Sequence, residues 1–199
     1  MEKQIIISIS REFGSGGHEI AEKIAKDLGL NLYDRDLLDK VAEEKGMSPE
    51  MVKKYDEKPR NLLLTRRVGE HSNSIAEHLA QMQFEYIKNK AESGESFVIV
   101  GRCAETILKS YPGLISVFVL GDREDKIAHV EKKYQLSESE AIVKMNRHDK
   151  TRKSYHNRHS DFRWGDSRGY DVCINSSRLG EDGTVQALED YIEKRKQTM

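Results

Sequence analysis

The chain forms its first apolar run with Ile5-Ile6-Ile7-Ser8-Ile9-Ser10 and continues with Arg11-Glu12-Phe13-Gly14-Ser15-Gly16-Gly17-His18. The run predicts a buried strand, and the apolar stripe from Ile20 to Leu28 predicts a helix directly after the glycines. Glycines allow the backbone to turn sharply and present successive N–H groups, and the N-terminus of a helix adds its positive dipole end. The order of strand, glycine-rich turn and helix therefore predicts a cradle for a phosphate group.

The complete phosphate-loop pattern, G-x-x-x-x-G-K-S/T, is not present. If Ser10 or Arg11 stands at the first glycine position and Gly16 at the second, Gly17 replaces the lysine and His18 replaces the Ser or Thr. The lysine normally neutralises the β- and γ-phosphates, and the hydroxyl normally holds Mg²⁺. Either another cation supplies this charge, or the chain binds phosphate without transferring it. Arg11 and His18 are the nearest candidates, and each is alternatively an exposed loop residue.

The composition indicates a water-soluble globular protein. Hydrophobic residues make up 37% and charged residues 34% of the chain, and the net charge of -1 gives no global field that favours nucleic acid or an anionic membrane. Cys103 and Cys173 are far apart without metal-ligand spacing, which is typical of a reducing cytoplasm. The sequence shows no signal peptide or spanning segment, so we expect a cytoplasmic protein without a membrane or nucleic-acid partner.

Apolar runs that predict buried strands alternate with helical patterns. The runs are Ile5–Ser10, Leu30–Tyr33, Phe97–Gly101, Ile115–Leu120 and Val172–Asn175. Because they are continuous, they fit strands covered on both faces, as in a parallel sheet. We expect helices over residues 18–28, 37–46, 75–86 and 185–192, and further helices that begin near residues 48 and 137. This alternation predicts an α/β fold with a doubly wound parallel sheet of about five strands.

Two regions fit the alternation poorly. Residues 48–70 contain Pro59 and several basic residues, and residues 146–170 are dense in basic and aromatic residues. We find no repeat and no linker long enough to divide the chain, so residues 1–199 are predicted to form a single domain. The second region leaves open a module that binds single-stranded nucleic acid, although the net charge and the strand–helix alternation argue against it.

Several motifs together resemble the cytidylate kinase-like family, a branch of the P-loop nucleoside monophosphate kinases. They occur in the family's order over nearly the whole chain: residues 10–17 (SREFGSGG), 33–38 (YDRDLL), 100–102 (VGR), 149–155 (DKTRKSY), 164–166 (WGD) and 170–175 (YDVCIN). The resemblance implies a P-loop NTPase-type sheet, a helical region for the nucleoside monophosphate at residues 48–70 and a lid at residues 146–170. It also implies that a glycine in place of the loop lysine is a property of this branch.

The same resemblance implies transfer of the γ-phosphoryl group of ATP to CMP or dCMP with Mg²⁺. We expect the phosphates of ATP to bind at the loop and the first helical turn. The predicted residues are Arg11, Gly14, Ser15, Gly16, Gly17, His18 and Glu19.

The acceptor is expected where the second and third strands end, because ligands bind at this edge of open α/β sheets. Asp34, Arg35 and Asp36 follow the second strand, and Gly101 and Arg102 end the third. Arg35 and Arg102 would hold the monophosphate, and Asp34 or Asp36 would accept hydrogen bonds from ribose, base or a Mg²⁺-bound water. Asp34 alternatively caps the next helix, and Arg102 alternatively forms a surface salt bridge.

Basic residues gather on the predicted helix that enters the lid. Arg147, Lys150 and Arg152 lie on one stretch, with Asp149 between them. In related kinases a lid brings arginines onto the transferring phosphoryl group, and such an arginine contributes ~10³-fold or more to the rate. We predict that these cations replace the missing lysine, while Asp149 orients Arg152 or helps to place Mg²⁺. The alternative is a solvated basic helix.

Besides the nucleic-acid module, three functions stay open on the sequence alone. The first is ATP- and Mg²⁺-dependent phosphoryl transfer to a nucleoside monophosphate, with CMP or dCMP expected. The second is a small-molecule kinase with another acceptor, and the third is a sensor that binds nucleotide or phosphate without turnover. A nucleotide is the expected partner and a homo-oligomer remains open. We predict no protein-borne metal site, because no histidine pair has a third ligand at suitable spacing.

Overall fold

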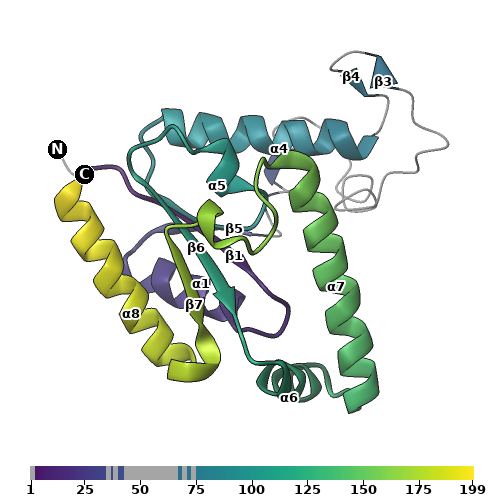
Figure 1. The fold of residues 1–199 in the computed structure, drawn as a ribbon. Coiled ribbons are helices and arrows are strands. Elements are labelled where there is room, and N and C mark those ends of the chain that lie inside the picture. Colours follow the sequence, from purple (N-terminus) through teal and green to yellow (C-terminus); the bar gives the residue numbers. More distant parts are fainter. Residues whose placement is uncertain (1–2, 35–36, 38–39, 43–66, 69–70, 73–74) are drawn as a thin grey trace.

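A central sheet of five parallel strands has the order β2-β5-β1-β6-β7 (Figure 1). The computed structural model describes residues 3–34, 37, 40–42, 67–68, 71–72 and 75–199. The strands are β1 (Ile6–Arg11), β2 (Asn31–Tyr33), β5 (Phe97–Val100), β6 (Leu114–Leu120) and β7 (Val172–Asn175). They coincide with the predicted runs to within one residue at each end, which confirms the α/β fold with a parallel sheet.

The central strand β1 supplies side chains to a core on each face of the sheet. Ile7 and Ile9 pack with α1 (Gly17–Asp27) and α8 (Ser176–Thr198). Ile6 belongs to the opposite core, which α4 (Ile75–Glu92) and α5 (Ala104–Ile107) cover (Figure 1). Successive side chains of a strand point to opposite faces, so an unbroken isoleucine run serves both cores.

A third hydrophobic cluster joins the glycine loop to α6 (Arg123–Tyr134) and α7 (Glu138–His159). Phe13 of the loop packs there against Ile127, Val130, Ala141 and Met145. The loop and these two helices are therefore positioned by one set of apolar contacts.

The helices follow the predictions in part. The capping box at Ser137 is confirmed, because its N–H donates to Glu140 Oε2 (2.9 Å) and α7 begins at the next residue. The sequence does not predict α6, whose two buried apolar residues are surrounded by charged ones. The predicted lid of residues 146–170 is helical as far as His159 and then passes through the short 3-10 helix η1 (Ser167–Gly169).

The predicted helix from residue 48 lies outside the described residues, and so does most of the one over 37–46. Leu37, Val41 and Ala42 are described and are buried beside α4. Within residues 48–70 the structure describes only β3 (Arg67–Val68), which pairs in antiparallel fashion with β4 (His71–Ser72) and was not predicted. Among the described helices, none is long and apolar enough to cross a membrane.

Candidate active site

Left-handed glycines shape the loop between β1 and α1. Gly14 has a φ of 87° and Gly16, the N-cap residue of α1, has a φ of 73°. A Cβ at Gly14 would lie 2.8 Å from the carbonyl oxygen of Lys126, so a side chain does not fit there. The Ser15 hydroxyl donates to the carbonyl oxygen of Glu12 (2.9 Å) and so closes the loop. Since Gly16 has no side chain to cap α1, the first N–H groups of the helix suit an anionic ligand.

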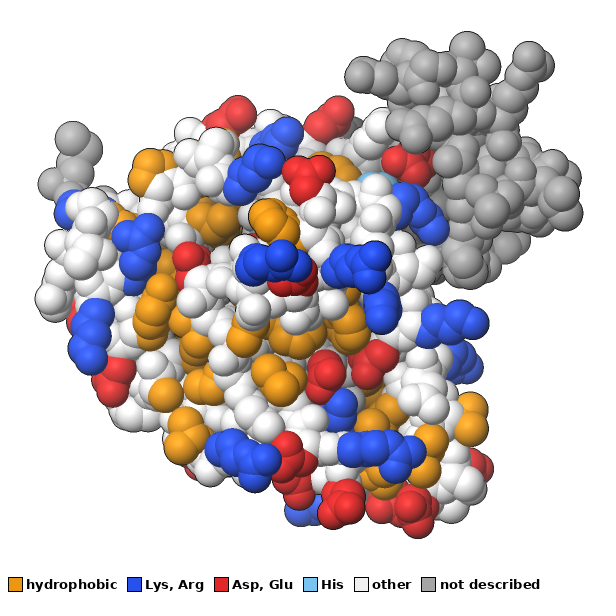
Figure 2. All heavy atoms as spheres, in the orientation of Figure 1, with side chains coloured by type: hydrophobic (Ala, Val, Ile, Leu, Met, Phe, Trp, Pro, Cys, Tyr) orange, Lys and Arg blue, Asp and Glu red, His pale blue; other side chains and the backbone are white. Residues whose placement is uncertain are grey.

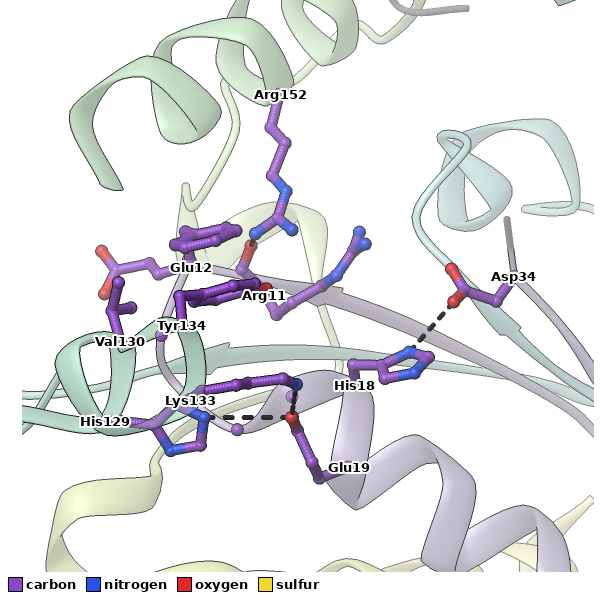
Figure 3. Close-up of a pocket in the computed structure, with 14 residues that line it drawn as sticks. Arg11, Glu12, His18, Glu19, Asp34, His129, Val130, Lys133, Tyr134 and Arg152 are labelled. Atoms are coloured by element: carbon purple, nitrogen blue, oxygen red, sulfur yellow. Dashed lines mark hydrogen bonds and ion pairs between the residues drawn. The ribbon is translucent and has the colours of Figure 1, made fainter. Parts of the chain in front are cut away.

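A cavity of about 300 Å³ opens in front of this loop (Figure 3). Its walls are the loop, the start of α1, the end of β2, α6 and α7. The lining residues are Arg11, Glu12, Phe13, Gly14, Gly16, Gly17, His18, Glu19, Asp34, His129, Val130, Lys133, Tyr134 and Arg152. The structure therefore brings together every predicted phosphate-binding residue except Ser15, and it adds Asp34 and Arg152 to them.

The helix α7 contacts the loop through Arg152 and Asp149. Arg152 Nη1 donates to the carbonyl oxygen of Arg11 (3.2 Å), and its guanidinium lies 5.3 Å from the ring centre of Phe13. The Phe13 N–H donates to Asp149 Oδ1 (2.7 Å). Burial raises the pKa of Asp149, although this hydrogen bond and Arg152 act in the opposite direction. Asp149 is thus a loop anchor in this structure, and Arg152 is the one of the three predicted lid cations that lines the cavity.

The other two predicted lid cations, Arg147 and Lys150, are exposed on α7 and do not line this cavity. Their predicted role would require a movement that brings them closer to the loop.

An ion pair links the start of α1 to the end of β2. His18 Nδ1 and Asp34 Oδ2 lie 3.0 Å apart (Figure 3), and His18 Nε2 lies 3.3 Å from Glu22 Oε1. The hydrogen bond to Asp34 raises the pKa of His18 above its ordinary value, against the opposing effect of burial. Asp34 therefore faces the cavity in contact with the residue that replaces the Ser or Thr of the full pattern. The predicted sites Arg35 and Asp36 lie outside the described residues.

Sequence reasoning missed the contribution of α6. Lys133 Nζ donates a hydrogen bond to Glu19 Oε1, and His129 Nε2 lies 3.8 Å from the same oxygen (Figure 3). Burial is the largest single effect and acts to raise the pKa of Glu19, but the Lys133 hydrogen bond, a backbone hydrogen bond and the charges of Lys133 and His129 together hold the pKa below its ordinary value. The spacing of His129 and Lys133, four residues apart, would have placed both on one helix face, but no helix was predicted there.

The end of β5 forms a tight turn beside the cavity. Gly101, Arg102 and Cys103 have φ values of 76°, 61° and 54°, a conformation that costs about 1–2 kcal/mol for each residue with a side chain. Arg102 is only 6% exposed, so it is not a surface side chain. Gly101 and Arg102 do not line the 300 Å³ cavity, and their predicted contact with the acceptor remains a prediction.

A second cavity, of about 280 Å³, lies on the other side of the loop. It shares Gly14, Gly16 and His129 with the first and extends to Ser176 and Ser177 at the start of α8. The two cavities therefore meet at the glycine loop.

Comparison with known proteins gives a family and a fold. A model of the cytidylate kinase-like family matches residues 6–178. A solved structure of an uncharacterized protein from Eubacterium ventriosum ATCC 27560 is 39% identical and covers 96% of this chain and 99% of its own, with a TM-score of 0.76.

Two shikimate kinases share the fold at low sequence identity. The enzyme from Bacteroides thetaiotaomicron is 13% identical over 95% of this chain and 98% of its own, with a TM-score of 0.55. The enzyme from Acinetobacter baumannii, solved in complex with shikimate, is 12% identical over 98% of this chain and 96% of its own, with a TM-score of 0.51. A search among curated proteins found no match.

The family match, over residues 6–178, includes the glycine loop, the ends of β2 and β5, α6 and α7. All the residues that line the 300 Å³ cavity lie within this match. The chain belongs to the cytidylate kinase-like family.

Proposed function

We propose that the chain transfers the γ-phosphoryl group of ATP to a nucleoside monophosphate, with CMP or dCMP as the expected acceptor. The observation that carries this proposal is one cavity in which the N-terminus of α1 meets the cationic side chains of Arg11, Lys133 and Arg152. Backbone N–H groups hold phosphates, but phosphoryl transfer also needs positive charge where the transition state develops negative charge. Membership of a kinase-like family supports the same class of reaction.

In the proposed reaction, a phosphate oxygen of the acceptor attacks the γ-phosphorus of ATP. The bond between this phosphorus and the β–γ bridging oxygen breaks, and ADP leaves with the electron pair. The α1 N-terminus would hold the phosphates of ATP, and Arg152 would stabilise the charge on the transferred group. Arg147 and Lys150 would join it if the lid closes, and Asp149 would keep the loop in place.

The two cavities suggest how donor and acceptor are arranged. We place the ATP base in the cavity beside Ser176 and Ser177, and the acceptor in the cavity that contains Asp34. This puts the acceptor at the ends of β2 and β5, where ligands of open α/β sheets bind. Arg35, Asp36, Gly101 and Arg102 are proposed to contact the acceptor from this edge.

Mg²⁺ would arrive with the phosphates of ATP and neutralise part of their charge. Asp34 offers a carboxylate, the ligand type that Mg²⁺ prefers, and its side chain is 15% exposed at the cavity. His18 already pairs with this carboxylate, and position 18 provides no hydroxyl ligand. The residues therefore fit an ion carried mainly by the nucleotide, with Asp34 bound to one of its waters.

An acceptor panel tests the proposal. Purified protein with ATP and Mg²⁺ is offered each common ribo- and deoxyribonucleoside monophosphate, and separately nucleosides, sugars and shikimate, while ADP formation is followed. We expect ADP only when CMP or dCMP is present. ADP formation with a sugar or another small molecule would identify a different acceptor, and no ADP with any acceptor would overturn the proposed activity.

Arg152→Ala tests the cavity cation itself. We expect kcat to fall about 10³-fold, because the positive charge that stabilises the transferred phosphoryl group is lost. The loss of ATP affinity should be much smaller. Lys153→Ala is the matched control, since Lys153 is the exposed neighbour on the same helix. Equal activity of the two variants would show that Arg152 is not the cation in question.

A nucleotide sensor is the second candidate, favoured by the His18–Asp34 pair at the position of the usual Ser or Thr. It predicts that ATP stabilises the fold without turnover. Sustained acceptor-dependent ADP formation would exclude it.

A further inference from the structure

Gly17 stands where the loop lysine is expected, and its surroundings leave no space for a side chain. A Cβ on Gly17 would lie 2.5 Å from Cβ and 2.9 Å from Cγ of Arg11, and 3.3 Å from Cβ of Val119. Real Cβ atoms essentially never come closer than 3.0 Å. The two Arg11 atoms are next to the β1 backbone, so they cannot swing aside like the end of a long side chain. A lysine at position 17 and a side chain at position 11 therefore exclude one another.

The sheet fixes Arg11 in this position. Arg11 is the last residue of β1 and pairs in register with Val119 of β6, and its carbonyl oxygen accepts from Arg152. Its side chain extends across the cavity (Figure 3), so that its Nη1 would lie only 2.7 Å from a Cβ on Gly101. Gly17 and Gly101 thus leave the space that this side chain fills. The guanidinium lies between the phosphate loop and the end of β5, where the acceptor is expected.

The complete phosphate-loop pattern has the opposite arrangement. With Gly16 as its second glycine, the pattern places a glycine at position 11 and the lysine at position 17. Here the cation is at position 11 and the glycine at position 17. The missing lysine is therefore half of an exchange between two residues in contact.

We propose that Arg11 replaces the loop lysine and that its guanidinium binds the β- and γ-phosphates. Arg11 would reach them from the end of β1, whereas a lysine at position 17 would reach them from the start of α1. A planar guanidinium is suited to this role because it donates two parallel hydrogen bonds to a phosphate. The inference deepens the proposed function, and any effect of Arg11 on turnover rests on that function. Its effect on polyphosphate binding can be measured whether or not the chain is a kinase.

A double-mutant cycle tests the exchange with Arg11→Gly, Gly17→Lys and the double variant, which restores the first glycine and the lysine of the pattern. Isothermal titration calorimetry measures affinity for inorganic tripolyphosphate and for ATP, and thermal melting monitors the fold. We expect Arg11→Gly to weaken tripolyphosphate binding about tenfold or more, because a charge-assisted contact is lost. We expect Gly17→Lys alone to lower the melting temperature through the clash, and the double variant to recover both stability and affinity.

Arg11→Gln covers the case in which a glycine at position 11 loosens the strand. It keeps the side chain against Gly17 but removes the charge, so it should fold normally and bind tripolyphosphate as weakly as Arg11→Gly. Arg195→Gln, at the far end of α8, is the control for loss of one arginine. Unchanged affinity in Arg11→Gln, or a double variant that binds no better than Arg11→Gly, would overturn the inference.

The parent protein separates this inference from the proposed function. If it binds tripolyphosphate but transfers no phosphoryl group to any acceptor, the proposed activity is wrong, and the affinities of the variants still decide the role of Arg11. If it turns over and Arg11→Gln keeps both affinity and kcat, the activity stands and the inference fails.

Discussion

His18 and Asp34 couple the start of α1 to pH. The pKa of His18 is raised in the folded protein by the hydrogen bond to Asp34, so the protonated pair stabilises the fold most below the ordinary histidine pKa of 6.5 and loses this effect as pH rises through the folded value. We expect His18→Gln to reduce the free energy of unfolding more at pH 5.5 than at pH 8.5. Urea denaturation at both values checks this, with the exposed His78→Gln as control. An equal effect of His18→Gln at both pH values would contradict it.

Two substitutions of Asp149 separate its role as a hydrogen-bond acceptor for the loop from the effect of its charge. Asp149→Leu removes the acceptor of the Phe13 N–H and is expected to reduce stability by about 1–3 kcal/mol. Asp149→Asn keeps an oxygen acceptor, and because burial raises the pKa of Asp149, loss of the ionised form at pH 7 does not itself destabilise the fold. We therefore expect Asp149→Asn to unfold within about 1 kcal/mol of the parent in urea. A loss as large as that of Asp149→Leu would mean that the charge, not the hydrogen bond, holds the loop.

The site residues differ in how far the sequence revealed them. The glycine loop, Asp34 and Arg152 carry local or family signals, and the structure places them at one cavity. Lys133 has no such signal, because its role depends on α6 packing beside Glu19. The exclusion between Arg11 and Gly17 depends on the close approach of the strand end to the first turn of α1, which residue spacing does not specify.

At the scale of elements, a buried pair connects α5 to α7. His156 Nε2 lies 2.9 Å from Glu105 Oε1, and both side chains are at most 5% exposed. Removal of one partner leaves the other buried, so we expect His156→Phe to cost about 3–5 kcal/mol of unfolding free energy. The double variant Glu105→Leu/His156→Phe should cost less than the sum of the single variants, as measured by urea denaturation.

The surface pair Lys109–Asp161 is the matched control for that measurement. Its atoms are 3.4 Å apart, but the side chains are 65% and 81% exposed. Solvent screens such a pair, so Asp161→Asn should cost less than about 1 kcal/mol. A cost for His156→Phe as small as this would show that the buried pair does not hold α7 to the sheet.

The five strands of the central sheet were predictable and the helix α6 was not, for a physical reason. A strand buried on both faces is apolar along most of its length, and β1, β5 and β6 carry that pattern locally, whereas the edge strands β2 and β7 are only partly buried. The helix α6 buries only Ile127 and Val130, and it is stabilised by packing against Phe13 and α7. Tertiary contacts of this kind leave a weak periodic signal in the sequence.

At the scale of the whole molecule, a polyphosphate should stabilise the fold by mass action. A ligand at 100 times its Kd adds about 2.7 kcal/mol to the free energy of unfolding. For a chain of this size that raises the melting temperature by roughly 5–10 °C. Thermal melting with ATP or tripolyphosphate checks this, with sodium sulfate at equal ionic strength as control. A shift no larger than that in sulfate would contradict phosphate binding at the loop.

The distribution of surface charge agrees with a small anionic ligand. On the face shown in Figure 2, lysine and arginine are interspersed with aspartate and glutamate among the coloured residues. A nucleic-acid surface would instead need a continuous basic stripe. The cationic side chains that line the cavity are confined to this one site, which suits a ligand the size of a nucleotide.

The glycine loop continues directly from the central strand of the sheet. The Glu12 N–H extends the ladder by donating to the carbonyl oxygen of Val119 (2.9 Å), and the Gly101 N–H donates to that of Ile9 (3.0 Å). Amide protons of β1 should therefore exchange with solvent only when the whole protein unfolds. An arriving nucleotide would meet a rigid receptor and lose little free energy to ordering it. Deuterium uptake in this segment should then be slow without ATP and slower still with it, because bound ATP adds to the free energy of global unfolding.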